Sequence, residues 1–348
     1  MDFNLKFFVV LRILVFGVLG LFLTSVSSCS ISGNLQRQET LCRLKGNHRY
    51  TKIPVVLDTD IGSDIDDTWA LCLLLQSPEL DIKLITTAVG DTSAKARIVA
   101  RLLEVAGRSD IPIGIGLPHK DKGPGHNQME WVKDYELSSY RGSIYKDGIQ
   151  ALIDTIMNSP EPIVVIVVGP LPNIAEALRR EPQIAKKARF VGMQGSIRRG
   201  YGDKSTPDAE WNARTYPEAT QKVFTAPWEM TITPLDTCGV VRLSGKKYQK
   251  VLKSKSPLAQ ALMENYRVWA KAQKAGEGKV DRGSTTLYDT VAIYLAISNE
   301  LVEMERLGIR VTDEGHTVID NNAKKINCAM KWKDLGTFED FLVQRLVN

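Results

Sequence analysis

The stretch Val55–Leu71, VVLDTDIGSDIDDTWAL, sets five aspartates between two apolar runs. Carboxylates at this spacing repel one another, and each loses favourable hydration when it is buried. A cluster of hard oxygen ligands suits Ca²⁺ or Mg²⁺, because the charge of the cation offsets the repulsion. The stretch therefore indicates a divalent-cation site at the end of a buried strand. The aspartates are Asp58, Asp60, Asp64, Asp66 and Asp67.

Apolar, strand-like runs alternate with helix-like segments after this stretch. The strand-like runs are rich in β-branched residues without polar alternation, which is typical of strands buried on both faces. The pattern predicts an α/β fold, a mainly parallel open sheet with helices on both faces. The predicted strands are residues 53–57, 82–89, 111–115 and 163–168, and the predicted helices are residues 67–76, 94–106, 148–157 and 173–180.

Three loops that follow predicted strands carry polar residues: the aspartate loop, Ala88–Asp91 and Gly169–Asn173. In an open parallel sheet the ligand lies beyond the carboxyl ends of the strands. We therefore expect the three loops to converge on one site.

The composition indicates a globular protein and argues against several other classes. The 348 residues are 43% hydrophobic, enough for a large globular core. The formal net charge is +5, but charges of both signs are interspersed, so we expect no nucleic-acid partner. No two of the five cysteines have CxxC spacing, which argues against a zinc knot or a redox pair.

The amino terminus has the layout of an export signal. Ile13–Leu23, ILVFGVLGLFL, follows Lys6 and Arg12 and precedes the small residues TSVSSCS. This order predicts a signal peptide over residues 1–28. Its end, VSSC, resembles a bacterial lipobox, in which Cys29 is lipidated and becomes the new amino terminus.

The remaining chain divides into a polar tether, residues 29–52, and a folded domain, residues 53–348. We expect an exported bacterial lipoprotein, periplasmic or at the cell surface, that meets the membrane only through its amino terminus. Two alternatives stay open: a plain signal peptide in which Cys29 is incidental, and an uncleaved anchor over Phe7–Val26.

Other interpretations account for some of the aspartates. Asp66 or Asp67 lies where a helix N-cap is expected. An EF-hand is excluded, because Gly62 stands where a ligand belongs and Trp69 where the closing glutamate belongs. Asp58-Thr59-Asp60 also has the DxD form of a haloacid dehalogenase-type phosphatase, which leaves the pair at the helix start unexplained.

LDTDIGSDIDDTWAL resembles the amino-terminal signature of the inosine-uridine-preferring nucleoside hydrolases, usually DxDxGxDD, with two extra residues between Gly62 and Asp66. The resemblance runs from about Ile53 to at least Ala296. Further segments similar to the family, in order, are LITTAVGD, IPIGIGLP, VVGPLPNIAEAL, PDAEWNARTYPEAT and LYDTVAIYLA.

This resemblance implies hydrolysis of the N-glycosidic bond of a small-molecule ribonucleoside, with one bound Ca²⁺, to free base and ribose. Asp60 matches the general base that holds the attacking water and is also a metal ligand. Asp67, Asp289 and the main-chain carbonyl of Pro172 match the other ligands. A ring of carboxylates would stabilise the oxocarbenium-like transition state.

The substrate-binding residues implied by the resemblance are Asp66, Glu210 and Asn212, which match groups that bind the ribose hydroxyls. Trp211, next to Glu210, is the best candidate for an aromatic wall of the base pocket. Trp131, Tyr135 and Trp228 are equally compatible with a core position, and His119 and His126 flank a glycine-rich loop.

Three implied site residues depart from the family. Asp91 and Lys204 stand where family members usually have asparagine. Tyr288 stands where many members have the histidine proposed to protonate the leaving base. A tyrosine, with a pKa of about 10, is a weaker acid at neutral pH.

Two further functions remain open: an exported protein that binds nucleosides without efficient turnover, and a Mg²⁺-dependent phosphohydrolase. Tyr288 and Lys204 favour the first, and Asp58-x-Asp60 favours the second. The sequence leaves the base preference and the oligomeric state open, a homo-oligomer included.

Overall fold

The aspartate stretch begins in β1 (Ile53–Thr59), which pairs in parallel with β2 (Leu80–Thr87) on one side and β5 (Ile163–Val167) on the other. The sheet therefore grows in both directions from β1, and the strand order reverses there. The carboxyl ends of β1 and β5 form a topological switch point, the usual place for a ligand in an open α/β sheet.

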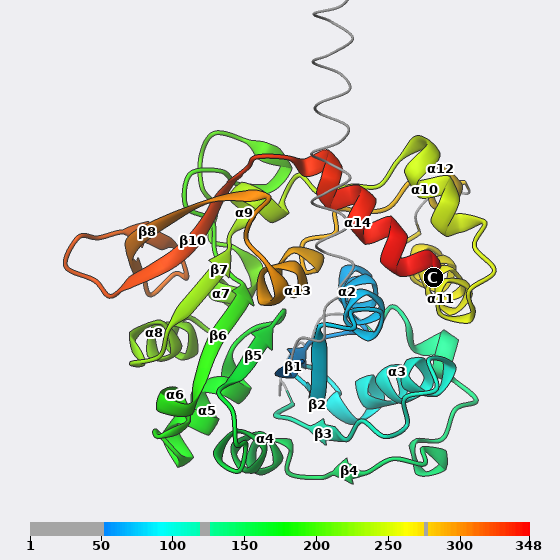
Figure 1. The fold of residues 1–348 in the computed structure, drawn as a ribbon, viewed down its shortest axis with the longest axis horizontal. Helices are drawn as coiled ribbons and strands as arrows, with labels where there is room; N and C mark the ends of the chain where they lie inside the picture. Colours follow the sequence, from blue (N-terminus) through cyan, green and yellow to red (C-terminus); the bar gives the residue numbers. More distant parts are fainter. Residues whose placement is uncertain (1–51, 119–125, 275–277) are drawn as a thin grey trace, which may run out of the picture. The chain divides into compact units, whose positions relative to one another are not determined.

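The computed structural model describes residues 52–118, 126–274 and 278–348, which fall in a single compact unit (Figure 1). The predicted signal peptide, most of the tether, Cys29 and His119 lie outside these residues. None of the helices within these ranges has both the length and the apolar character needed to cross a membrane.

The described residues form a sheet of ten strands in the order β4-β3-β2-β1-β5-β6-β7-β10-β8-β9. Neighbours from β4 to β10 are parallel, and β8 pairs antiparallel with β10 and β9. The prediction of a mainly parallel open sheet is confirmed. The remaining strands are β3 (Ile113–Ile115), β4 (Ile144–Tyr145), β6 (Ala188–Met193), β7 (Met230–Thr233), β8 (Val302–Val311), β9 (Thr317–Ile319) and β10 (Lys325–Trp332).

Helices cover both faces of the sheet. On one face α4, α5, α6 and α8 pack together, and on the other α2 contacts α11 and α13. The helices are α2 (Asp66–Leu75), α3 (Thr92–Val105), α4 (Gly148–Met157), α5 (Pro172–Arg180), α6 (Ile184–Lys187), α7 (Trp211–Thr215), α8 (Pro217–Thr225), α9 (Leu235–Cys238), α10 (Gly245–Leu252), α11 (Pro257–Ala272), α12 (Lys279–Arg282), α13 (Thr290–Ile297) and α14 (Leu335–Val347), with 3₁₀ turns η1 (Met129–Val132), η2 (Leu137–Ser139) and η3 (Tyr201–Asp203).

The predicted elements lie within a few residues of the observed ones, and α4 has the predicted bounds. The caps differ. The N-cap of α2 is Ile65, so Asp66 and Asp67 occupy the first turn itself. Asp91 caps α3 by accepting a bond from the Ala94 amide, which starts this helix two residues earlier than predicted.

Asp58, the first aspartate of the series, is a structural residue. It is completely buried, and it accepts hydrogen bonds from the hydroxyl of Thr86 and from Asn173 Nδ2, the latter at 2.7 Å. Burial raises the pKa of Asp58 to about 7. Because Asp58 does not line the site cavity described below, the phosphatase interpretation loses the first carboxylate of its DxD pair.

Asn173 joins the ends of three strands. Its Nδ2 bonds to Asp58 and to the Thr87 carbonyl, and its Oδ1 accepts a 2.8 Å bond from the Leu117 amide. This residue lies inside α5, whose N-cap is Leu171, rather than capping it.

We expect Asn173→Leu, which keeps the side-chain shape, to lower the free energy of unfolding by about 1–3 kcal/mol, because it leaves buried polar groups without partners. Urea unfolding measures this change. The control is Asn327→Leu, since Asn327 is partly exposed on β10 and makes one 3.5 Å contact with Glu229. Its expected effect is within about 0.5 kcal/mol. Equal effects of the two substitutions would contradict a role for the Asn173 bonds.

Candidate active site

A cavity of about 440 Å³ lies at the switch point, beyond the carboxyl ends of β1 and β5. One part of its wall is acidic and another is aromatic. Its lining residues are Asp60, Ser63, Asp64, Asp66, Asp67, Asn127, Val168, Met193, Tyr201, Glu210, Trp211, Asn212, Trp269, Gln273, Tyr288 and Asp289.

Asp60 is fixed by its own loop. The Ser63 hydroxyl lies 2.7 Å from the Asp60 carbonyl oxygen and 3.2 Å from its carboxylate oxygen Oδ2. Gly62, with a φ of +103°, makes the turn between them, a conformation that favours glycine. A Cβ atom on Gly169, in the loop after β5, would lie 2.7 Å from Asp60 Oδ1, so this loop approaches Asp60 without room for a side chain.

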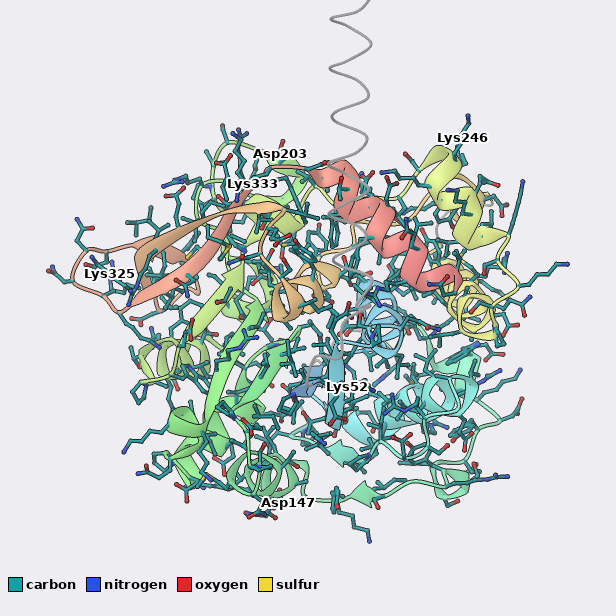
Figure 2. All side chains as sticks on the ribbon, viewed as in Figure 1. Lys52, Asp147, Asp203, Lys246, Lys325 and Lys333 are labelled. Atoms are coloured by element: carbon teal, nitrogen blue, oxygen red, sulfur yellow. The ribbon has the colours of Figure 1, made fainter. Side chains whose placement is uncertain are left out.

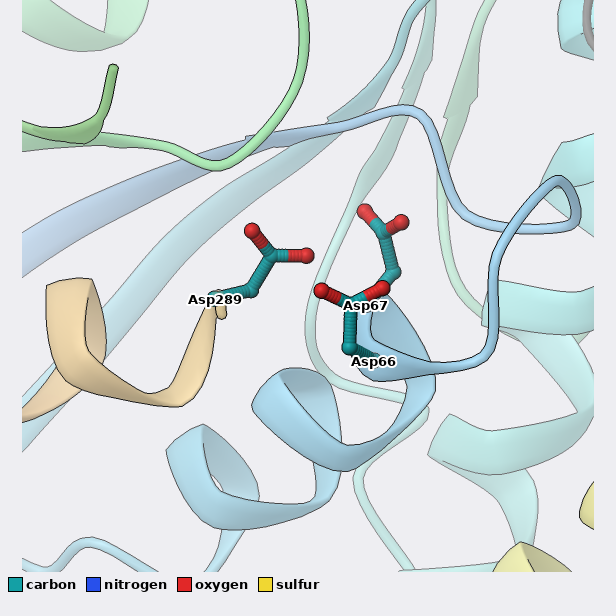
Figure 3. A group of neighbouring side chains, drawn as sticks. All are labelled: Asp66, Asp67 and Asp289. Carbon is teal, nitrogen blue, oxygen red and sulfur yellow. The ribbon is translucent and has the colours of Figure 1, made fainter. Parts of the chain in front are cut away.

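Three buried carboxylates meet from two helices. Asp66 and Asp67 come from the first turn of α2 and Asp289 from the residue before α13, and one oxygen of each lies within 4.8 Å of the others (Figure 3). The Thr59 hydroxyl donates to Asp67. The partial positive charge at the start of α2 favours acidic groups there.

In their ionised form the carboxylates of this cluster repel one another and are poorly hydrated. Burial, followed by mutual repulsion, raises the pKa values of Asp66, Asp67 and Asp289 well above the ordinary range of an aspartate. Burial also raises the pKa of Asp60. The donors are all oxygen atoms, which fits a hard cation such as Ca²⁺ or Mg²⁺.

Lys95 in α3 is completely buried behind the aspartate loop. Its Nζ donates a 2.6 Å hydrogen bond to the Asp60 carbonyl and lies 3.3 Å from both Ser63 Oγ and the Ala88 carbonyl. Burial lowers the pKa of Lys95, although the charges of Asp60 and Asp67 act in the opposite direction.

Glu210 and Asn212 form another polar part of the wall. The Glu210 carboxylate caps α7 by accepting from the amides of Asn212 and Ala213, and it also accepts from the Gly195 amide. Burial outweighs these three bonds and raises the pKa of Glu210 to about 7. Asn212 Nδ2 donates to the carbonyls of Val168 and Met193 at 3.2 and 3.0 Å.

The aromatic wall brings Tyr201, Trp211 and Tyr288 together. The rings of Tyr201 and Tyr288 meet edge to face, with centroids 6.1 Å apart. The Tyr201 hydroxyl accepts a 2.9 Å bond from the Trp211 amide. Burial raises the pKa of Tyr288 to about 12, so its phenol keeps its proton throughout the neutral range.

The cavity lining does not include three of the implied site residues, Asp91, Lys204 and Pro172. Asp91 is an exposed helix cap. Lys204 is exposed and pairs at 2.6 Å with Asp208, and Figure 2 shows its neighbour Asp203 at the upper margin of the folded domain. Pro172 opens α5, so its carbonyl points along the helix and away from its amino-terminal end.

The cavity lining does not include the other aromatic candidates, Trp131, Tyr135 and Trp228, or His126. Trp131 and Trp228 are core residues.

Seven lining residues were not singled out from the sequence: Ser63, Asn127, Val168, Met193, Tyr201, Trp269 and Gln273. Two of them brace the aspartate loop. Asn127 Nδ2 and Trp269 Nε1 donate to the Ser63 carbonyl at 2.7 and 3.2 Å. Val168 directly follows β5, and its position at the end of a buried strand is the feature of the sequence that could have identified it as a site residue.

Comparison with known proteins identifies related sequences. A family model described as inosine-uridine preferring nucleoside hydrolase matches residues 55–339. The non-specific ribonucleoside hydrolase RihC of Klebsiella pneumoniae is 30% identical over 276 residues, 76% of this chain and 85% of that protein. RihC of Salmonella paratyphi B is 31% identical over 283 residues, 76% of this chain and 87% of that protein.

Solved structures share the fold. A plant nucleoside hydrolase, PpNRh1, aligns with a TM-score of 0.73 at 24% identity, over 85% of this chain and 99% of that one. The inosine-uridine preferring nucleoside hydrolase of Bacillus anthracis aligns with a TM-score of 0.66 at 17% identity, over 84% and 99%. The family model spans most of the folded domain, and the RihC relatives match over three quarters of the chain. The chain therefore belongs to the inosine-uridine preferring nucleoside hydrolase family and is an enzyme of that hydrolase class.

Proposed function

We propose that this enzyme hydrolyses the N-glycosidic bond of ribonucleosides in a calcium-dependent reaction that releases free base and ribose. The observation that carries the proposal is the acidic wall of one cavity, where buried Asp60, Asp66, Asp67 and Asp289 are joined by Glu210. A nucleoside has one end rich in hydroxyls and one flat aromatic end, and the cavity has a carboxylate wall and an aromatic wall to match.

Asp60, Asp67 and Asp289 are the side chains that would hold calcium. The Val168 carbonyl is better placed than that of Pro172 to complete the set, because Val168 lines the cavity and this carbonyl accepts a bond from Asn212, another lining residue. The oxygen-only donors and the unfavourable burial of the carboxylates both support this assignment. When bound, calcium supplies positive charge that orients the attacking water and the ribose hydroxyls.

Asp60 acts as the general base in this proposal. Its carboxylate lines the cavity and is held by the Ser63 hydroxyl, which leaves Oδ1 to take the proton of the attacking water. The same carboxylate wall stabilises the positive charge that develops on the ribose ring as the bond to the base breaks.

Asp66, Glu210 and Asn212 bind the ribose. Ionised Asp66 and Glu210 accept hydrogen bonds from ribose hydroxyls, and the three backbone amides around Glu210 fix its carboxylate before the substrate arrives. A sugar held in this way presents its anomeric carbon in a fixed orientation, which lowers the entropic part of the barrier.

Tyr288 and Trp211 contact the base in this arrangement, and Tyr288 is the candidate acid for the leaving base. Its raised pKa, about 12, makes it a poor proton donor at neutral pH. The enzyme therefore relies more on stabilising the ribosyl cation than on protonating the base.

The purified protein is expected to release free base from a panel of purine and pyrimidine ribonucleosides when calcium is present, and to lose this activity after chelation, with recovery on adding calcium back.

Asp60→Asn should reduce kcat by ~10²–10⁴-fold or more while leaving the fold intact, because it removes the general base. Chromatography of free base gives both rates. Full activity without metal, or near-normal kcat in Asp60→Asn, would contradict the proposal.

If Tyr288 does donate a proton to the leaving base, Tyr288→Phe should lower kcat/KM for natural nucleosides but barely change it for a nitrophenyl riboside, whose leaving group needs no proton. The ratio of the two kcat/KM values isolates the acid role from ground-state binding. An equal loss on both substrates would mean that Tyr288 positions the ribose or packs the wall.

For the amino terminus, which lies outside the described residues, we propose export and lipid attachment at Cys29, supported by the apolar run and the VSSC sequence before the domain. Fractionation of cells that express Cys29→Ser is expected to find less protein with the membrane than in the wild type. Complete retention in the membrane fraction would favour an uncleaved anchor.

A further inference from the structure

Thr317, in the edge strand β9, lies far from Glu210 in the sequence, but a short chain of hydrogen bonds joins the two residues. The Thr317 hydroxyl accepts a 2.9 Å bond from the Ser196 amide and donates a 2.9 Å bond to the Ser196 carbonyl. The residue before Ser196 is Gly195, whose amide donates at 2.9 Å to Glu210 Oε2. One hydroxyl therefore holds the residue next to an amide that fixes the Glu210 carboxylate.

The contact between Thr317 and this loop is close and buried. Gly195 has a φ of +83°, a conformation that favours glycine. A Cβ atom on Gly195 would lie 2.6 Å from Thr317 Oγ1, so the strand and the loop meet without room for a side chain. Thr317, Ser196 and Glu210 are each at most 2% exposed. The main-chain groups of Ser196 therefore depend on the Thr317 hydroxyl rather than on solvent.

The turn between β8 and β9 also contacts α7, the helix that Glu210 caps. A Cβ atom on Gly315 in this turn would clash with the Cα atom of Arg214, so the turn lies directly against the backbone of the helix. Asn212 and Ala213, whose amides donate to Glu210, belong to the same helix. The β8–β9 hairpin therefore contacts both segments that supply amides to the carboxylate, the loop after β6 and the start of α7.

Other bonds hold the loop after β6 in its general place. The Leu235 amide donates to the Gly195 carbonyl at 2.9 Å, and the Asp236 carboxylate accepts from the two amides that follow Ser196 at 2.9 and 2.8 Å. Loss of the Thr317 hydroxyl should therefore leave the loop folded, while it frees the Ser196 main chain and the adjacent Gly195 amide to reorient.

We infer that Thr317 is a positioning residue for ribose recognition: through Ser196 and Gly195 it fixes the direction in which the Glu210 carboxylate meets a ribose hydroxyl. This inference rests on the proposed ribose-binding role of Glu210. Thr317 does not line the cavity, so it acts through the loop and not on the substrate. A carboxylate that is fixed before the substrate arrives loses less conformational freedom on binding, which strengthens its bond to the sugar.

Thr317→Val keeps the shape of the side chain and removes the hydroxyl. It should lower kcat/KM for a ribonucleoside by about tenfold, the factor expected when a hydrogen bond to a charged group is weakened. The comparison uses the 2′-, 3′- and 5′-deoxy analogues of the same nucleoside. For the analogue that lacks the hydroxyl bound by Glu210, Thr317→Val should change kcat/KM by less than about twofold. Glu210→Gln identifies this analogue independently, as the substrate whose kcat/KM it lowers least.

Three further variants separate the hydroxyl from packing. Thr317→Ser keeps the hydroxyl and should keep wild-type kcat/KM on every substrate. Gly195→Ala disturbs the same contact from the other side and should reproduce the selective loss. Thr155→Val is the matched control, because it removes a hydroxyl that bonds to the Ala151 carbonyl within α4, and it should change kcat/KM for none of the substrates.

No loss in Thr317→Val, an equal loss on the ribonucleoside and all three analogues, or an equal loss in Thr317→Ser would overturn the positioning role and leave the proposed reaction standing. A wild-type protein that releases no base from any nucleoside would overturn the proposed function, and the role of Thr317 with it. Thermal unfolding shows whether each variant is folded. If Thr317→Val does not fold, Gly195→Ala carries the same comparison, and failure of both to fold would mean that the contact supports the fold and not the site.

Discussion

Mutual repulsion among buried carboxylates is the constraint on which the site depends. Asp66, Asp67 and Asp289 each bring one oxygen to within 4.8 Å of the others where the strand order reverses, and Asp60 lines the same cavity. Each of the four is at most 6% exposed. Without compensation they would hold protons or force the cavity open. The first turn of α2 and the proposed cation each reduce this cost. The surrounding loops hold the carboxylates close together despite their mutual repulsion.

Much of this arrangement follows from the order of residues. Fully apolar strands alternating with amphipathic helices predict a parallel sheet, and the rule that ligands lie at the carboxyl ends of strands selects the loops to examine. The aspartate series then identifies one part of the acidic wall, and the resemblance to the nucleoside hydrolases adds the segment around Glu210. The aspartates lie close together in sequence, and for that reason their spacing alone reveals them.

Other features were not predictable, because they depend on contacts between distant segments. The burial of Lys95 behind the aspartate loop depends on how α3 packs against the loop, and charged residues in a helix usually face solvent. Tyr201 reaches the cavity from a 3₁₀ turn with no distinctive pattern. Asp91 and Lys204 show the opposite error: both are polar residues in loops near the site, yet local hydrogen bonds and ion pairs hold them away from the cavity lining.

The distance in sequence between Asp67 and Asp289, roughly 220 residues, has a consequence for how the enzyme folds. The two carboxylates meet only after α13 has docked against α2, so the cavity is completed by contacts of high sequence separation. Asp60, Asp66 and Asp67 are translated early and lie together in a short segment. Asp289 is added to them late, against their repulsion. The same docking buries the apolar side chains of α13, so the charge repulsion and part of the apolar burial that offsets it arise together.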